Sequence, residues 1–190
     1  LHCKGIVHRD IKPENVLMSH TSDVVKLADF GLAVVIHTSS PANLKRFCGT
    51  PMYVAPEIVE RATHGFKADV WSLGILLYVT LSGETPFPDE DDVDDLWDRI
   101  KRGAWSFDES PEIWNQVSVE ARDLITKMLV VDPAERLSAQ EVCNHRWFSM
   151  SPGLTAEASV TSVASAASAA AAAAAASVAA AAAEATTATA

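Results

Sequence analysis

Cysteine is scarce in this sequence, and its scarcity excludes two kinds of structure. The chain of 190 residues has three cysteines, Cys3, Cys48 and Cys143, and no two of them form a CxxC pair. This spacing indicates neither a zinc site nor a disulfide framework. A reducing compartment is the simplest interpretation, so we expect an intracellular protein, cytoplasmic in the first instance with the nucleus as the alternative.

Basic residues are also in the minority. Lysine and arginine total 15 against 25 aspartates and glutamates, which gives a formal net charge of −10. An acidic chain repels the phosphate backbone of DNA or RNA, so we expect no nucleic-acid partner. The same charge is compatible with basic peptide substrates.

The sequence lacks a second region of globular composition. Residues 1–148 mix apolar, aromatic and charged residues with turn signals, whereas residues 149–190 are almost entirely Ala, Ser, Thr and Val. We expect one domain over residues 1–148 and an Ala/Ser-rich low-complexity tail over residues 149–190, disordered or transiently helical. The uncharged stretch 158–183 is long enough to cross a bilayer, but it lacks Leu, Ile and Phe, so a membrane span is not expected.

Helical periodicity dominates residues 1–148, which predicts a mainly α fold with short strands. Helices are predicted over residues 69–81, 92–101, 118–130 and 138–145, and a strand over residues 24–27. The first of these helices is apolar nearly all round, so we expect it to be buried. The last begins with Ser138 and Glu141 in the spacing of a capping box.

The strongest chemical signal is the run His8-Arg9-Asp10-Ile11-Lys12-Pro13-Glu14-Asn15. Asp29-Phe30-Gly31 and Ala55-Pro56-Glu57 follow it in that order. Each short motif alone is weak, but the three together match the catalytic loop, the metal-binding tripeptide and the end of the activation segment of one family. Over residues 1–148 the chain resembles the eukaryotic protein kinase superfamily, with the fold of the C-terminal lobe.

The resemblance implies a role for each polar residue of these motifs. Asp10 would position the substrate hydroxyl as the catalytic base, and Asn15 and Asp29 would hold Mg²⁺ against the phosphates of ATP. Hard oxygen ligands suit Mg²⁺, and phosphoryl transfer needs positioning and charge neutralisation more than covalent help. Lys12 would contact the transferred phosphate, and Thr50 would hydrogen-bond near Asp10 and Lys12. Lys12 and Thr50 together mark the serine/threonine type.

Other matches to the family are structural. Glu57 and Arg136 correspond to a buried ion pair that anchors the end of the activation segment. Asp69 would hydrogen-bond the catalytic-loop backbone, or cap its own helix, or do both. We expect His8 to be a packed structural histidine.

The remaining histidines and tryptophans are assigned by simpler reasoning. A lone histidine is expected at the surface, as for His20, His37 and His64. Trp71, Trp114 and Trp147 are expected to anchor the core.

Several segments resemble the calcium/calmodulin-dependent group of kinases in particular. They are residues 48–57, 71–78, 82–83, 86–87, 129–136 and 145–148. This resemblance implies protein or peptide substrates in which basic residues precede the target Ser or Thr. Glu14 and the acidic run 89–95 are candidates to read those residues, although the run is more simply a solvated loop.

The activation segment departs from the family pattern at the position where relatives are often phosphorylated. In many relatives, the arginine at the position of Arg9 binds a phosphate on the activation segment. Relatives often place a threonine two residues before the cysteine of Cys48-Gly49-Thr50, and here that position is Arg46. We expect no required phosphate at position 46, and residues 38–40 remain candidates farther away.

Only seven residues precede His8, which leaves no room for a glycine-rich loop, a strand lysine and its partner glutamate. We therefore expect the N-terminal lobe to be absent, and the isolated chain to bind nucleotide weakly, to be nearly inactive and to aggregate. Two hypotheses stay open. The chain is part of a serine/threonine kinase that transfers the γ-phosphoryl group of ATP, or it is a non-catalytic lobe that serves as a binding or scaffold module. The intact set Asp10, Lys12, Asn15 and Asp29 favours the first, and the oligomeric state is left open.

Overall fold

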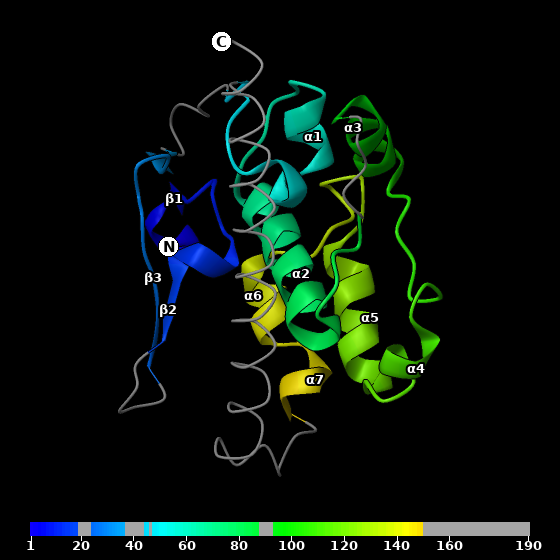
Figure 1. The fold of residues 1–190 in the computed structure, drawn as a ribbon. Coiled ribbons are helices and arrows are strands. Elements are labelled where there is room, and N and C mark those ends of the chain that lie inside the picture. Colours follow the sequence, from blue (N-terminus) through cyan, green and yellow to red (C-terminus); the bar gives the residue numbers. More distant parts are fainter. Residues whose placement is uncertain (19–23, 37–43, 46, 88–92, 150–190) are drawn as a thin grey trace, which may run out of the picture.

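The computed structural model describes residues 1–18, 24–36, 44–45, 47–87 and 93–149. The tail from residue 150, position 46, the candidate phosphorylation sites at 38–40 and residues 89–92 of the acidic run lie outside the described residues. His20 and His37 lie outside them too. The described part is mainly helical with short strands, as predicted (Figure 1). The domain boundary after residue 148 stays a prediction.

The elements follow one another in a simple order. In the described residues the strands are β1 (Ile6–Val7), β2 (Val16–Met18), β3 (Val25–Leu27) and β4 (Val34–Val35). The helices are α1 (Pro56–Val59), α2 (Phe66–Ser82), α3 (Val93–Arg102), α4 (Pro111–Trp114), α5 (Val119–Met128), α6 (Ala139–Cys143) and α7 (Arg146–Ser149). Short 3-10 turns cover His2–Lys4, Pro13–Asn15 and Pro51–Tyr53.

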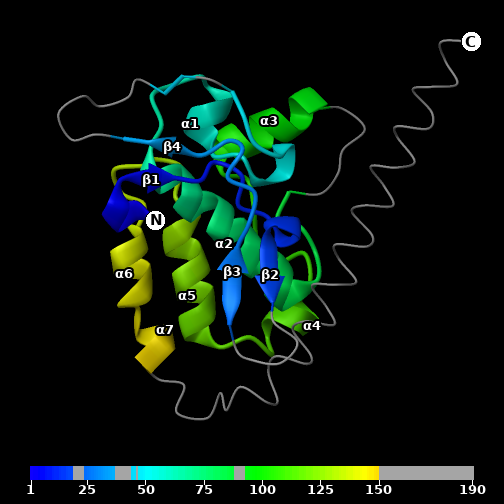
Figure 2. The ribbon, with the colours of Figure 1, turned by 90° about the vertical axis from the view of Figure 1, so that its left-hand side faces the viewer.

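Helix α2 forms the centre of the fold, as its apolar sequence predicts. The strands lie on one side of it and α5 on the other (Figures 1 and 2). Trp71 and Ile75 are completely buried. Gly74 lets α5 approach, because a Cβ at Gly74 would lie 2.8 Å from Cδ2 of Leu129. The helix ends at Ser82, and its C-cap is Gly83, whose φ of +78° is a conformation that favours glycine.

The start of α2 differs from the prediction. The helix begins at Phe66 with Gly65 as its N-cap, so the interpretation of Asp69 as an N-cap is wrong. Asp69 lies in the first turn, and its carboxylate accepts hydrogen bonds from the catalytic-loop backbone instead. The buried backbone amides of that loop therefore have their partner on α2.

The strands pair as two small antiparallel sheets. β1 pairs with β4, and β2 pairs with β3 with Val16 opposite Leu27. The predicted strand at 24–27 is confirmed as β3. The other three strands were not predicted, because two or three residues are too short to show an alternating pattern. Leu17 and Val25 on the second sheet are more than half exposed, at 54% and 59%.

The remaining helices confirm most of the pattern-based predictions. Ser118 caps α5 through a hydrogen bond from the backbone N–H of Ala121. Ser138 and Glu141 form the predicted capping box at α6. In α3, Leu96 and Ile100 are the buried side chains.

The predicted burial of aromatic and histidine side chains is correct in part. Trp71 and Trp114 are buried, whereas Trp147 is only partly buried against a smaller cluster around Leu124 and Met128. The prediction that His64 lies at the surface is wrong, since the residue is only 4% exposed. Its backbone N–H donates to the carbonyl of Leu44, so a residue far away in the sequence lies beside it.

Of the helices in the described ranges, none combines the length and the apolar character that crossing a bilayer requires.

Candidate active site

The catalytic loop is held to α2 by its backbone. The two carboxylate oxygens of Asp69 accept hydrogen bonds from the N–H groups of His8 and Arg9, each at 2.8 Å. Arg9 has a φ of +69°, which is unusual for a residue with a side chain. Its side chain also donates from Nε to the carbonyl of Leu32 at 2.6 Å. These bonds place the following residue, Asp10, at a fixed position.

The carboxylate of Asp10 is surrounded by donors. Its Oδ1 accepts from both the N–H and the hydroxyl of Thr50, at 3.1 and 2.9 Å. Its Oδ2 accepts from Nδ2 of Asn15 at 3.0 Å and lies 3.3 Å from Nζ of Lys12. Burial acts to raise the pKa of Asp10, but the hydrogen bond from Thr50 and the charge of Lys12 outweigh it and hold this pKa below its usual value. Asp10 is therefore ionised at neutral pH.

Thr50 connects the activation segment to the catalytic loop. Its hydroxyl donates to Asp10 and accepts a hydrogen bond from Nζ of Lys12 at 2.8 Å. The predicted hydrogen bonding of Thr50 beside Asp10 and Lys12 is thus confirmed. Gly49 allows this approach, because its φ is +105° and a Cβ there would lie 2.9 Å from the carbonyl oxygen of Arg9.

Asn15 and Asp29 lie at the same end of the β2–β3 hairpin. Asn15 immediately precedes β2, Asp29 closely follows β3, and the N–H of Ala28 donates to the carbonyl of Asn15 at 2.8 Å. Nδ2 of Asn15 donates both to the backbone carbonyl and to the carboxylate of Asp10, so Oδ1 of Asn15 is the amide atom suited to a cation. Asp29 is exposed, and its Oδ1 accepts from the N–H of Gly31 at 3.0 Å.

This donor set fits Mg²⁺, which prefers a few carboxylate or amide oxygens together with phosphate and water. Within the described ranges there is no group of three or more His, Cys, Asp or Glu side chains that could hold a metal ion. A pair of oxygen ligands is consistent with a metal ion that arrives with a nucleotide rather than one resident in an all-protein cage.

His8 joins the catalytic loop to the Asp29 segment. The side chain is completely buried, donates from Nε2 to the carbonyl of Ala28 at 3.0 Å, and lies 5.0 Å from the ring of Phe30 in an edge-on contact. Its Nδ1 accepts from the N–H of Asp10 at 3.4 Å. The prediction of a packed structural histidine is confirmed.

One side chain at the site was missed in the sequence analysis. Nε2 of His2 lies 2.8 Å from Oδ2 of Asp69, the same oxygen that holds the N–H of His8. A lone histidine six residues before His8 carries no pattern that would single it out. It belongs to the support of the catalytic loop, not to the residues predicted to touch substrate.

Comparison with known proteins identifies the family that this geometry suggests. The protein kinase domain model matches residues 1–148, and the chain belongs to the protein kinase family. The chain is 47% identical over 150 residues to calcium/calmodulin-dependent protein kinase type II subunit delta of Oryctolagus cuniculus, with 78% of this chain and 27% of that protein covered. It is 42% identical over 157 residues to the Dictyostelium discoideum protein named probable serine/threonine-protein kinase fhkE, with 78% of this chain and 21% of that protein covered.

The first relative is by name a calcium/calmodulin-dependent protein kinase, the group that the motifs resemble, and the second is by name a probable serine/threonine-protein kinase. The chain spans about a quarter of the length of these curated relatives. Protein kinases use ATP, so the family also implies the nucleotide expected from the motifs.

Proposed function

We propose that this protein is a serine/threonine protein kinase that transfers the γ-phosphoryl group of ATP to Ser or Thr hydroxyls of protein substrates. We assign residues 1–148 to the C-terminal lobe of its kinase domain. The observation that carries the proposal is the arrangement around Asp10, whose carboxylate is bonded by Thr50 and Asn15 and lies beside Lys12.

Each residue of this arrangement has a chemical task. Asp10 is ionised and fixed, so it accepts a hydrogen bond from the attacking hydroxyl and takes its proton as phosphoryl transfer proceeds. Lys12 places a positive charge next to the acceptor, which offsets the negative charge of the transferred phosphoryl group. Thr50 holds both side chains in position through one hydroxyl.

Asn15 and Asp29 are the proposed ligands of Mg²⁺. When bound, the metal neutralises the phosphate oxygens of ATP. The contribution of this chain is to present two hard oxygen donors at one end of the β2–β3 hairpin.

We also propose that the substrates carry basic residues before the target Ser or Thr. Glu14 is exposed next to the catalytic loop, and Asp94 and Asp95 are exposed in the first turn of α3. The net charge of −10 acts in the same direction, since it favours the approach of basic peptides. No observation favours the alternative of a scaffold module, because each of the four proposed catalytic and metal-binding side chains is present.

The experiment is an assay of the protein purified from its own cells, with radiolabelled ATP and three peptides. One peptide has a serine preceded by arginines, one has the same serine preceded by glutamates, and one has a tyrosine in the basic context. We expect label on the first peptide, much less on the second and none on the third. Absence of label on all three, with ATP and Mg²⁺ in excess, would remove the proposal, whereas equal label on the first two would remove only the substrate preference.

A further inference from the structure

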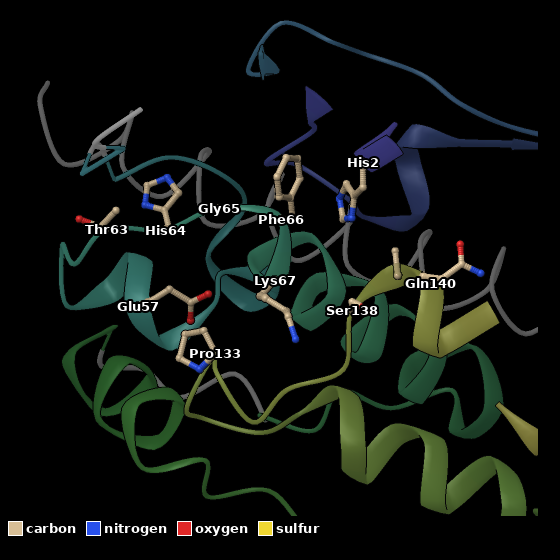
Figure 3. Close-up of a pocket in the computed structure, with 11 residues that line it drawn as sticks. His2, Glu57, Thr63, His64, Gly65, Phe66, Lys67, Pro133, Ser138 and Gln140 are labelled. Atoms are coloured by element: carbon tan, nitrogen blue, oxygen red, sulfur yellow. The ribbon is translucent and has the colours of Figure 1, made fainter. Parts of the chain in front are cut away.

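The described part of the chain ends in two short helices that are lightly packed. The first turn of α6 borders a cavity of about 350 Å³, which it shares with Phe66 and Pro133 (Figure 3). Helix α7 has four residues, none of which is buried, and it packs against the cluster around Leu124 and Met128 through Trp147. A helix this short and this exposed opens at little cost in free energy, so the residues of α7 can leave the fold locally.

The last residue of α7 is a serine at the surface. The hydroxyl of Ser149 donates to the backbone carbonyl of Arg146 at 2.9 Å, and both residues are exposed. Nη2 of Arg146 lies 3.9 Å from Oε1 of Glu120, a separation at the limit of an ion pair. Surface pairs of this kind contribute little free energy, so Arg146 can exchange Glu120 for a carboxylate of another molecule.

The sequence around Ser149 has the character proposed above for a substrate. Arg146 precedes Ser149 by three positions. It is the last Lys or Arg in the sequence, and Ser149 is the first Ser or Thr that follows it. A serine shortly after an arginine suits the acidic surface proposed to read substrates, in which Glu14 and Asp95 are exposed.

We propose that Ser149 is a phosphorylation site and that a second copy of this protein phosphorylates it. This inference rests on the proposed kinase function. Oγ of Ser149 attacks the γ-phosphorus of ATP on the second copy. The bond from Oγ to phosphorus forms, the bond from that phosphorus to the bridging oxygen of ADP breaks, and the hydroxyl proton passes to Asp10 of the second copy.

The geometry favours transfer between copies over transfer within one chain. Thr50 is bonded to Asp10 and lies shortly before α1, whereas α1 and α7 lie at opposite ends of the fold (Figures 1 and 2). His145, directly before α7, is held to Asp123 at 3.0 Å. Opening of α7 therefore releases only residues 146–149, which span at most about 14 Å when extended. That motion presents Ser149 to another molecule but does not carry it across the fold.

The test mixes two forms of the protein, each purified from its own cells and treated with a phosphatase that is then removed. A tagged Asp10→Asn copy is the acceptor, and a small amount of untagged wild type is the enzyme. Both are incubated with radiolabelled ATP, Mg²⁺ and the peptide whose serine follows arginines. Mass spectrometry locates the phosphate. We expect label on the peptide and on Ser149 of the tagged copy, and none on a tagged copy incubated without wild type.

Three variants of the tagged copy test the site itself. Ser149→Ala should remove the label. Arg146→Gln should slow labelling about tenfold, as for the loss of one contact to a charged group, and Arg146→Lys should restore most of the rate. Thr126→Ala is the matched control and should leave labelling unchanged. The hydroxyl of Thr126 is also exposed and donates to the carbonyl of an arginine, Arg122, but it lies within the longer helix α5.

The outcomes separate this inference from the function on which it rests. Label on the peptide without label on Ser149 of the tagged copy would overturn the inference and leave the proposed function standing. Label that stays on the wild type would show transfer within one chain, and equal rates for Arg146→Gln and the unchanged copy would show that Arg146 is not read. Either result would also overturn the inference. Absence of label on peptide and protein alike would remove the proposed function, and the inference with it.

Discussion

The guanidinium of Arg136 donates two hydrogen bonds of 2.9 Å to the two carboxylate oxygens of Glu57, across 79 positions of sequence. Both side chains are almost completely buried. Arg136 also donates to the carbonyls of Val130, Val131 and Lys67, and its guanidinium carbon lies 5.1 Å from the centre of the Trp71 ring. One side chain thus joins the end of the activation segment, α2 and the loop after α5.

Breaking this pair should destabilise the fold strongly. Glu57→Gln leaves a buried, unpaired guanidinium, so we expect a loss of about 3–5 kcal/mol in the free energy of unfolding. Arg136→Met should cost at least as much, because it also leaves carbonyl groups without their donor. Urea unfolding measures both. The control is Lys127→Ala, which removes an exposed ion pair with Asp123 and should lower the free energy of unfolding by at most about 1 kcal/mol. A loss for Glu57→Gln as small as that of Lys127→Ala would contradict this account.

Asp69→Asn should loosen the catalytic loop. The amide has one acceptor oxygen, whereas the carboxylate accepts from His8, Arg9 and His2. Hydrogen bonds to a charged group contribute about 1.5–3 kcal/mol, so the variant should lose roughly that much. Hydrogen exchange reports the effect locally, since the amides of His8 and Arg9 should lose protection while those of α5 change less. Asp98→Asn, an exposed substitution on α3, should leave both amides protected.

Thr50→Val should move the acid limb of the pH–rate profile to higher pH. The variant removes the hydroxyl that helps to hold the pKa of Asp10 below its usual value, so that pKa rises. Asp10 must be ionised to act as the proposed base, and kcat/KM therefore begins to fall at a higher pH in Thr50→Val than in the wild type. Thr50→Ser keeps a hydroxyl and should keep the wild-type profile. Coincident acid limbs for the wild type and Thr50→Val would contradict the role given to this hydrogen bond.

The same carboxylate links stability to pH. Because the folded pKa of Asp10 is depressed, its contribution is fully present above the unfolded value of about 3.9 and is lost as the pH falls through the lower folded pKa. Because Thr50→Val raises the folded pKa of Asp10, it narrows the interval between the folded and the unfolded pKa of this residue. The free energy of unfolding should therefore fall less in the variant than in the wild type as the pH is lowered through that window.

Gly74→Ala should destabilise the packing of α2 against α5. A methyl group would lie 2.8 Å from Cδ2 of Leu129 and 3.0 Å from Cβ of Met128. We expect a loss of about 1–3 kcal/mol from overpacking, reduced by up to about 1 kcal/mol through the better helix propensity of alanine. In a Leu129→Ala background the clash is relieved, so Gly74→Ala should cost less there. Equal costs in both backgrounds, measured by urea unfolding, would contradict close contact at this position.

The long-range contacts of the site could be predicted because the residues that make them belong to motifs of a known family. Glu57 and Arg136 are far apart in sequence, and Thr50 is 38 positions after Lys12, yet the resemblance to one family placed each pair together. Helices with strong apolar periodicity were also predictable, although the observed ends differ from the predicted ends by a few residues.

What could not be predicted depends on the tertiary environment of single residues. His64 has the sequence context of an exposed turn, but the folded chain buries it and pairs its backbone with that of Leu44. His2 has no motif, and its importance comes only from its contact with Asp69. The first turn of α2 was missed, because Phe66 and Lys67 follow a glycine and do not extend the apolar run.

The most direct test of the central claim is the rate of phosphoryl transfer to a basic serine peptide by Asp10→Asn, compared with the wild type and with Asp98→Asn, each protein being purified from its own cells as in the peptide assay. Asparagine keeps the shape of Asp10 but cannot take a proton, so we predict a loss of roughly 10²–10⁴-fold in kcat. Asp98→Asn, on the exposed face of α3, should retain the wild-type rate. An Asp10→Asn protein that transfers phosphate at the wild-type rate would contradict the assignment of Asp10 as the catalytic base.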